Sequence, residues 1–306
     1  MPARSPAAGS LLELESLSSR DIHNILKEAK ALARVPRARL ARKLTGRRIA
    51  LLFYEASTRT RISFEYAAKN LGAVTAVMTS AGSSIEKGES LLDTGYTLEA
   101  TGAECIIMRH PHSGAAELLA RHVRVPVINA GDGMHEHPSQ GLLDAYTMLE
   151  HKRNLKGLRV VIVGDVRHSR VARSNIHLLS KFGAQIVLCG PEALLPQVAT
   201  TLAKEATIER DFDRALRGAD VVMMLRVQKE RLAGLSLDLA EYIRDYQLDS
   251  ARVAKAKKDA IVMHPGPIIR GMELTAEAAD GPQSVIVEQV ANGVLIRMAL
   301  LLRALA

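Results

Sequence analysis

The segment that decides the fold is residues 49–72, which read IALLFYEASTRTRISFEYAAKNLG. Its first six residues, 49–54, form a short apolar run and predict a buried strand. Residues 59–71 have a helical pattern, which Gly72 ends. A strand that leads through a short hydroxyl-rich loop directly into a helix predicts one unit of an α/β fold.

The same unit recurs along the chain. Further strands are predicted at residues 74–78, 105–109, 125–130, 160–165, 185–189, 221–225 and 261–263. Helical patterns separate most of them, and this alternation favours parallel sheets covered by helices. Ser18 and Asp21 predict a capped helix start before residue 22.

The length and the element pattern suit two domains or one large one. A polar stretch at residues 151–156 follows the helix that Pro138 opens, so a domain boundary is expected within residues 138–156. The last helix, residues 285–305, is long and apolar and must be buried. It could pack back on the first domain and make that domain discontinuous.

The composition excludes several classes of protein. The chain has 306 residues, a formal net charge of +8 and 3% aromatic residues. No basic stretch is interleaved with aromatic residues, as it would be in many nucleic-acid-binding proteins, so small anionic substrates are the expected partners of the positive charge. No apolar run is long enough to span a membrane, and no signal peptide is visible. The two cysteines, Cys105 and Cys189, lie in apolar runs, which favours buried thiols and a cytoplasmic location.

The loop within residues 53–61 is the strongest candidate for a binding site. A helix that begins directly after a strand presents backbone N–H groups at the positive end of its dipole. Ser57, Thr58 and Thr60 add hydroxyl donors, and Arg59 adds a planar guanidinium. The loop is therefore predicted to bind a phosphate-like anion. The alternative is an ordinary helix cap with solvated arginines.

Other polar residues also follow predicted strands. Arg109, Arg226 and Gln228 do so, and Arg170 comes near the start of a helix. Ligands of open parallel sheets bind at the carboxyl ends of the strands. These side chains are candidates for anion contacts, although each could also be an ordinary surface residue. Residues 160–165 lack the glycine fingerprint of a dinucleotide site, so no such cofactor is expected.

The residues His135, Glu136 and His137 invite a metal interpretation. The spacing differs from His-Glu-x-x-His, and no third ligand cluster stands out, so no metal is predicted. A histidine can instead donate a hydrogen bond to a carbonyl oxygen that becomes negative in a transition state. Gln140 follows at a spacing that places it beside His137.

Two further loops carry polar or rigid sequence. Residues 264–267 read His-Pro-Gly-Pro, a turn with few backbone donors whose carbonyls can accept bonds from an amide NH₂. Residues 83–90 form a polar loop that contains Ser83, Lys87 and Gly88. Such loops often carry function, although an ordinary surface loop has the same composition.

Together these motifs, in their order, resemble the carbamoyltransferases, and within them the aspartate transcarbamoylases, over essentially the whole chain. The resemblance implies two α/β domains, residues 1–137 plus 289–306 for carbamoyl phosphate and residues 138–288 for aspartate. It implies transfer of a carbamoyl group from carbamoyl phosphate to L-aspartate, a step of pyrimidine biosynthesis, without a cofactor.

The resemblance also implies roles for single residues. The phosphate would be bound by Ser57, Thr58, Arg59, Thr60 and Arg109. The carbonyl would be polarised by Arg59, Thr60, Arg109 and His137. The carbamoyl NH₂ would be held by Gln140 and by Gly266 and Pro267, whose peptide bond is expected to be cis. The aspartate carboxylates would be bound by Lys87, Arg170, Arg226 and Gln228. Ser83 and Lys87 would come from a neighbouring subunit.

A site shared between chains implies a homotrimer, alone or in a larger assembly with dihydroorotase or regulatory chains. Ile269 stands where relatives often have a polar residue, which affects the packing of that loop. Two alternatives stay open: a carbamoyltransferase for another acceptor such as ornithine, and a non-catalytic paralogue that acts as an assembly subunit.

Overall fold

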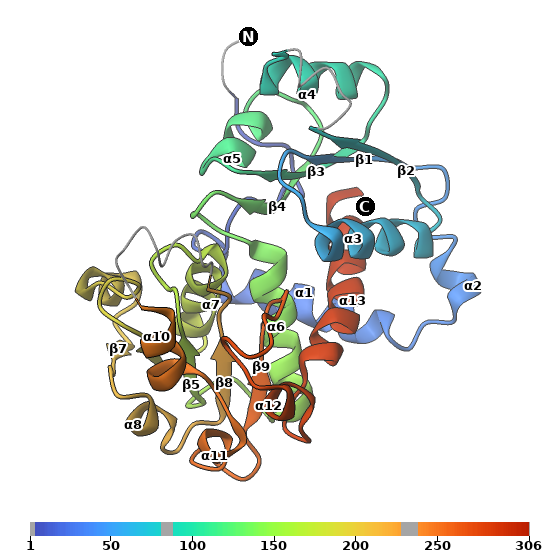
Figure 1. Ribbon diagram of the computed structural model, residues 1–306. Coiled ribbons are helices and arrows are strands. Elements are labelled where there is room, and N and C mark those ends of the chain that lie inside the picture. Colours follow the sequence, from blue (N-terminus) through green and yellow to red (C-terminus); the bar gives the residue numbers. More distant parts are fainter. Residues whose placement is uncertain (1–3, 81–87, 228–237, 306) are drawn as a thin grey trace. The chain divides into compact units, whose positions relative to one another are not determined.

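The computed structural model describes residues 4–80, 88–227 and 238–305. The chain divides into two compact units, Met1–Leu142 with Ala291–Ala306, and Leu143–Val290. Each unit contains one sheet in which all strand pairs are parallel, and helices flank both sheets (Figure 1). The predicted fold class is confirmed.

The first unit contains a four-stranded sheet of order β2-β1-β3-β4. Its strands are β1 (Arg48–Phe53), β2 (Val74–Thr79), β3 (Cys105–His110) and β4 (Val127–Asp132). Its helices are α1 (Ser19–Leu32), α2 (Arg37–Leu40), α3 (Thr58–Asn70), α4 (Leu91–Ala100) and α5 (Ala115–Ala120). β1, β3 and β4 are buried along almost their whole length, as expected for strands covered on both faces.

Alternate residues of the central strands build one layer of the core. Ala50, Leu52, Ile106 and Met108 pack with Leu119 and its neighbours from the α4 and α5 region. The α1 helix begins as predicted, because the Ser18 Oγ accepts a hydrogen bond from the Asp21 N–H at 3.1 Å.

The second unit contains a five-stranded sheet of order β7-β6-β5-β8-β9. Its strands are β5 (Arg159–Val163), β6 (Gln185–Cys189), β7 (Ala206–Ile208), β8 (Val221–Met224) and β9 (Ile261–Met263). Its helices are α7 (Arg170–Lys181), a 3₁₀ helix (Gln197–Leu202), α8 (Phe212–Leu216), α10 (Leu239–Tyr246), α11 (Ser250–Val253) and α12 (Ala276–Asp280). The three-residue edge strand β7 was missed by the sequence analysis.

Two long helices connect the units. They are α6 (Pro138–His151) and α13 (Ile286–Leu305), and the chain passes from one unit to the other within each. The C-terminal part of α13 lies beside α3 in the first unit (Figure 1). The guanidinium of Arg297 lies 4.9 Å from the ring centroid of Phe64, and its Nη1 donates a hydrogen bond to the Ser63 Oγ. The predicted return of the last helix to the first domain is therefore confirmed.

Several predicted boundaries were wrong by one or two residues. The fourth strand begins at Val127 rather than at residue 125, because Pro126 has no N–H to contribute to the ladder. The third strand continues through His110, so Arg109 lies inside it. Within the described residues, none of the helices combines the length and the apolar character that crossing a membrane requires.

Candidate active site

The predicted site residues of the first unit lie at or just after the ends of three neighbouring strands. β1, β3 and β4 are adjacent and parallel, so their carboxyl ends lie at the same edge of the sheet. Residues 54–57 follow β1, Arg109 is near the end of β3, and His137 follows the loop after β4. The register therefore gathers these residues at the edge where ligands of parallel sheets bind.

The loop after β1 ends at the N-terminus of α3. Ser57 occupies the N-cap position with φ −158° and ψ 96°, and its side chain makes no capping hydrogen bond. The first turn carries Thr58 and Arg59, which are exposed, and Thr60, which is buried. A helix start whose cap hydroxyl is not engaged with the first turn suits an anion that takes that place.

Arg109 lies directly beside this loop. It is opposite Phe53 in the β1–β3 register, and its carbonyl accepts a hydrogen bond from the Tyr54 N–H at 2.9 Å. Its side chain is 11% exposed, and its Nη2 forms an ion pair with the Glu55 Oε1 at 2.5 Å. The Nη1 donates a bond to the Ala130 carbonyl at 3.3 Å. The guanidinium is thus held near the start of α3 in a fixed orientation.

The loop after β4 is organised by buried carboxylates. Asp132 accepts hydrogen bonds from the Gly114 N–H at 2.7 Å and from the Asn129 Nδ2 at 2.7 Å. It also contacts the His135 Nδ1 at 3.1 Å, and this contact raises the pKa of His135 to about 9. These bonds fix the backbone that leads to His137.

His137 and Gln140 meet at the start of α6, as predicted. Both side chains are buried, and the Gln140 N–H donates to the His137 carbonyl at 2.9 Å. The Ser139 Oγ lies 3.5 Å from the His137 Nδ1. This turn presents a histidine and an amide from one short segment.

The second unit has the same arrangement of loops after adjacent strands. Arg170 begins α7 after β5, Arg226 follows β8, and Gly266 and Pro267 follow β9. Because β5, β8 and β9 are neighbours in a parallel sheet, these residues lie at one edge of it. Arg226 is exposed and Arg170 is half-buried, so both can meet an anion from solvent.

Glu273 joins two of these loops. Its Oε1 accepts a bond from the Val227 N–H at 3.0 Å, and its Oε2 accepts one from the Ile269 N–H at 3.0 Å. Burial raises the pKa of its carboxyl group. The sequence analysis missed this residue, although it noted Ile269 as a departure within the same loop.

A second buried network supports the His-Pro-Gly-Pro turn. The Gly266–Pro267 bond is cis, as the family resemblance predicted. The Gly266 N–H donates to the His264 Nδ1 at 2.8 Å, and the His264 N–H donates to the Gln289 Oε1 at 2.9 Å. The Gln289 Nε2 donates to the Asp144 Oδ1 at 2.9 Å. Asp144 and Gln289 were also missed, because neither lies in a recognisable motif.

Three predicted site residues, Ser83, Lys87 and Gln228, lie outside the described residues. All the others have the positions given above, each at the strand-end edge of its own sheet.

Two family models together cover nearly the whole chain. Residues 10–150 match the model described as "Aspartate/ornithine carbamoyltransferase, carbamoyl-P binding domain". Residues 156–304 match the one described as "Aspartate/ornithine carbamoyltransferase, Asp/Orn binding domain". The chain belongs to the aspartate/ornithine carbamoyltransferase family.

Members of this family are similar to the chain over almost its entire length. It is 58% identical over 297 residues to an aspartate carbamoyltransferase catalytic subunit of Koribacter versatilis, and the match covers 97% of each of the two chains. It is 53% identical over 293 residues to the corresponding subunit of Solibacter usitatus, and the match covers 95% of this chain and 97% of that one.

Solved structures of the aspartate/ornithine carbamoyltransferase family have the same fold. The aspartate transcarbamoylase of Trypanosoma cruzi, in complex with N-(phosphonacetyl)-L-aspartic acid, has a TM-score of 0.88 and 33% identity, and the match covers 100% of this chain and 98% of that one. The ornithine carbamoyltransferase of Pyrococcus furiosus has a TM-score of 0.85 and 29% identity, covering 98% and 97%. The fold is thus common to members with different acceptors.

Proposed function

We propose that the chain transfers the carbamoyl group of carbamoyl phosphate to the amine of L-aspartate. The products are N-carbamoyl-L-aspartate and phosphate, as in pyrimidine biosynthesis. The observation that carries the proposal is the convergence of the α3 N-terminus, Arg109 and the His137 loop at three adjacent strand ends. The similarity to aspartate carbamoyltransferase catalytic subunits supports aspartate as the acceptor.

In this proposal residues 1–137 plus 289–306 bind carbamoyl phosphate. The backbone N–H groups of the first turn of α3 and the hydroxyls of Ser57, Thr58 and Thr60 hold the phosphate dianion. Arg59 and Arg109 supply planar donors for its oxygens. The helix dipole adds a favourable electrostatic contribution because it points its positive end at the anion.

We propose that hydrogen-bond donors around the carbonyl oxygen of carbamoyl phosphate stabilise the transition state. When the neutral amine attacks the carbonyl carbon, negative charge develops on that oxygen. Thr60, Arg59, Arg109 and His137 are assigned to stabilise it, and losing one such donor typically costs a factor of about 10²–10³ in kcat. The tetrahedral intermediate then expels phosphate, which can accept the amine proton as it leaves.

Residues 138–288 are assigned to aspartate. Arg170 and Arg226, together with Gln228, are proposed to bind its two carboxylates. Gln140 and the backbone of Gly266 and Pro267 are proposed to hold the carbamoyl NH₂. Holding both substrates converts a bimolecular reaction into an effectively unimolecular one, which supplies much of the acceleration.

The assembly and location follow the family resemblance. We propose that Ser83 and Lys87 act in the site of a neighbouring subunit of a homotrimer. We also propose a cytoplasmic location, because both thiols are free and buried. A larger assembly with dihydroorotase or regulatory chains is compatible with this arrangement.

The test is phosphate release from carbamoyl phosphate, measured in parallel with aspartate and with ornithine. Release with aspartate alone is expected. Release with ornithine alone would overturn the roles of Arg226 and Lys87 but leave the phosphate site intact. Release with neither acceptor from the purified trimer would contradict the proposed activity and favour a non-catalytic paralogue.

A further inference from the structure

Glu136 directly precedes His137, and the proposed mechanism gives it no role. Its side chain is buried, and a buried carboxylate is costly unless hydrogen bonds satisfy it. Its Oε1 accepts bonds from the Leu14 N–H at 2.9 Å and the Glu15 N–H at 3.0 Å, and its Oε2 lies 3.0 Å from the Leu14 nitrogen. Glu136 therefore connects the loop after β4 to a segment 122 residues away in the sequence.

Hydrogen bonds also close the loop that ends at Glu136. The Asp132 N–H donates to the Glu136 carbonyl at 3.2 Å, and the Glu136 N–H donates to the Asp132 Oδ1 at 3.3 Å. The next residue is His137, and α6 begins directly after it at Pro138. The backbone of His137 thus lies between this loop and a helix start, so a displacement of Glu136 would move it.

The N-terminal segment can act as a fixed support because it is attached to the sheet. The Leu11 N–H donates to the Val127 carbonyl at 2.9 Å, and the Leu11 carbonyl accepts a bond from the Asn129 N–H at 2.8 Å. These bonds pair the segment with β4, the last strand of the sheet. Leu11 and Leu14 are both buried. The N–H groups that Glu136 accepts therefore belong to backbone that is itself held in place.

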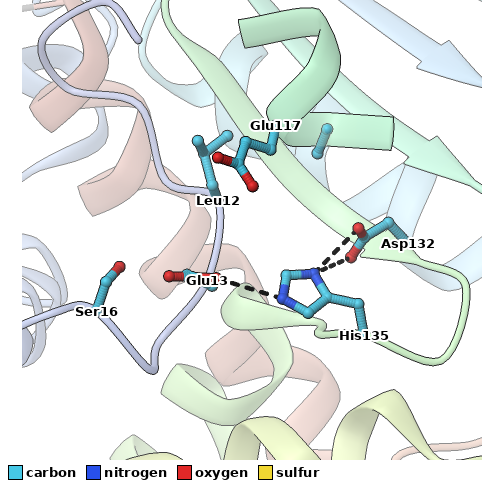
Figure 2. Close-up of a pocket in the computed structure, with 7 residues that line it drawn as sticks. Leu12, Glu13, Ser16, Glu117, Asp132 and His135 are labelled. Atoms are coloured by element: carbon cyan, nitrogen blue, oxygen red, sulfur yellow. Dashed lines mark hydrogen bonds and ion pairs between the residues drawn. The ribbon is translucent and has the colours of Figure 1, made fainter. Parts of the chain in front are cut away.

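A second contact joins the same segment to the same loop. Figure 2 shows the His135 ring between Glu13 on one side and Asp132 on the other. The His135 Nε2 lies 3.3 Å from the Glu13 Oε2, and its Nδ1 lies 3.1 Å from both carboxylate oxygens of Asp132. Because the hydrogen bond to Asp132 raises the pKa of His135 to about 9, the ring is cationic at neutral pH and attracts both carboxylates.

We propose that Glu136 is a positioning residue for His137. Its carboxylate fastens residues 14 and 15 to the loop after β4 and thereby fixes the backbone that carries the His137 side chain. The inference rests on the proposed function, in which His137 donates to the carbonyl oxygen in the transition state. Such a donor is effective when its position is set before the reaction. A displacement of about 1 Å can lower the rate by a factor of about 10².

The first test compares Glu136→Ala with Glu136→Gln in the full chain, by steady-state phosphate release with aspartate. We expect kcat to fall by a factor of about 10–100 in Glu136→Ala. The KM for carbamoyl phosphate should change little, because the phosphate is assigned to the start of α3. Glu136→Gln should lie much closer to the wild type, since its amide oxygen can replace the Oε1 that accepts both N–H groups.

The matched control is Glu104→Ala. The Glu104 carboxylate also accepts a bond from a distant backbone N–H, that of Arg48, at 2.9 Å. It directly precedes β3, at the opposite end of the strand from the candidate site. Its kcat should equal that of the wild type. Equal losses of kcat in the two alanine variants, or an unchanged kcat in Glu136→Ala, would overturn the proposal.

A double variant tests whether Glu136 acts through His137. In His137→Ala, which removes the donor, the addition of Glu136→Ala should lower kcat no further. A second, independent loss would contradict the proposal. An unchanged kcat in His137→Ala alone would contradict the proposed function of His137 instead.

The last measurement does not depend on catalysis. Hydrogen exchange, read by mass spectrometry, reports local opening of the backbone, and the amides of residues 133–141 should exchange about tenfold faster in Glu136→Ala than in the wild type. In Glu104→Ala these amides should exchange at the wild-type rate. Unchanged exchange in Glu136→Ala would overturn the proposal whether or not the chain transfers a carbamoyl group.

Discussion

At the scale of single residues, the contacts of Arg109 hold its side chain in place for the phosphate contact that we propose. Its guanidinium is almost buried and is already paired with Glu55. A buried cation needs a partner, and a neighbouring carboxylate supplies it while the phosphate is absent. These contacts keep the planar guanidinium of Arg109 in a narrow range of orientations, so little side-chain entropy is lost when substrate binds.

Replacement of Arg109 by lysine should remove most of the activity. Lysine keeps the charge but cannot donate two parallel bonds, so we expect kcat to fall by a factor of about 10²–10³. The measurement is steady-state phosphate release over a range of carbamoyl phosphate concentrations.

The control for that variant is Arg47→Lys. Arg47 forms an ion pair with Glu104 at 2.5 Å, but its side chain is 48% exposed and lies elsewhere in the unit. Activity close to that of the wild type is expected there. Equal losses in the two variants would show that Arg109 acts only through general stability.

At the scale of elements, Asp144 determines which groups donate and which accept in a network of buried hydrogen bonds. It lies on α6 and accepts bonds from Asn175 on α7 at 2.8 Å and from Gln289 on α13 at 2.9 Å. The Gln289 amide cannot reverse, because its oxygen accepts the His264 N–H. A single buried carboxylate therefore orients three helices and the turn that carries Gly266.

Asp144→Asn should destabilise the protein although it keeps the shape of the side chain. One of its two oxygens becomes an NH₂ group that faces another donor, so we expect a loss of about 1–3 kcal/mol of unfolding free energy. Urea unfolding followed by circular dichroism measures it.

A matched acid in the same unit is Asp280, which pairs with Arg270, and the side chains of Asp280 and Arg270 are 65% and 50% exposed. Asp280→Asn should cost less than about 1 kcal/mol, because exposed ion pairs contribute little. If the two variants unfold at the same urea concentration, the network does not carry the stability assigned to it.

The contact between α13 and α3 links the last helix to the helix whose start we propose to bind the phosphate. Arg297 is buried against Phe64 and Ser63, which lie on α3. Arg297→Met should loosen α3, and we expect KM for carbamoyl phosphate to rise more than KM for aspartate. Isothermal titration with phosphate alone checks this in the absence of turnover, and unchanged phosphate affinity would contradict it.

At the scale of the whole molecule, local patterns predicted most of the fold. Strand, loop and helix follow one another within about 25 residues, as in residues 49–72, so short-range hydrophobic patterns reveal them. Strand β7 was missed because three residues carry too little pattern. The loop between β1 and α3, for which we propose a phosphate-binding role, was likewise singled out from local sequence alone.

The supporting residues could not be predicted in the same way. Glu13 and His135, or Asp144 and Gln289, are distant in the sequence, and only the folded chain brings each pair together. A lone Glu or Gln in a helical segment looks like an ordinary surface residue. The sequence therefore indicates the residues that we propose to contact the substrates better than the residues that hold them in place.

Both thiols should be unreactive in the folded protein. Cys105 and Cys189 are buried, and desolvation raises the pKa of each to about 12. Because the thiolate is the nucleophile, reaction with a disulfide reagent at pH 8 should be negligible. We expect two thiols per chain to react only after addition of denaturant. Rapid labelling of the native chain would show that one of the two sheets opens readily.

The return of α13 to the first unit has a consequence for biosynthesis. Residues 291–306 belong to the first unit but are translated after all of the second. The N-terminal part of the nascent chain therefore lacks the contact between Arg297 and Phe64 until the second unit has been synthesised. The second unit is continuous in sequence and can fold on the ribosome before the first is complete. During translation, the half of the chain made first is thus the last to gain its full set of contacts.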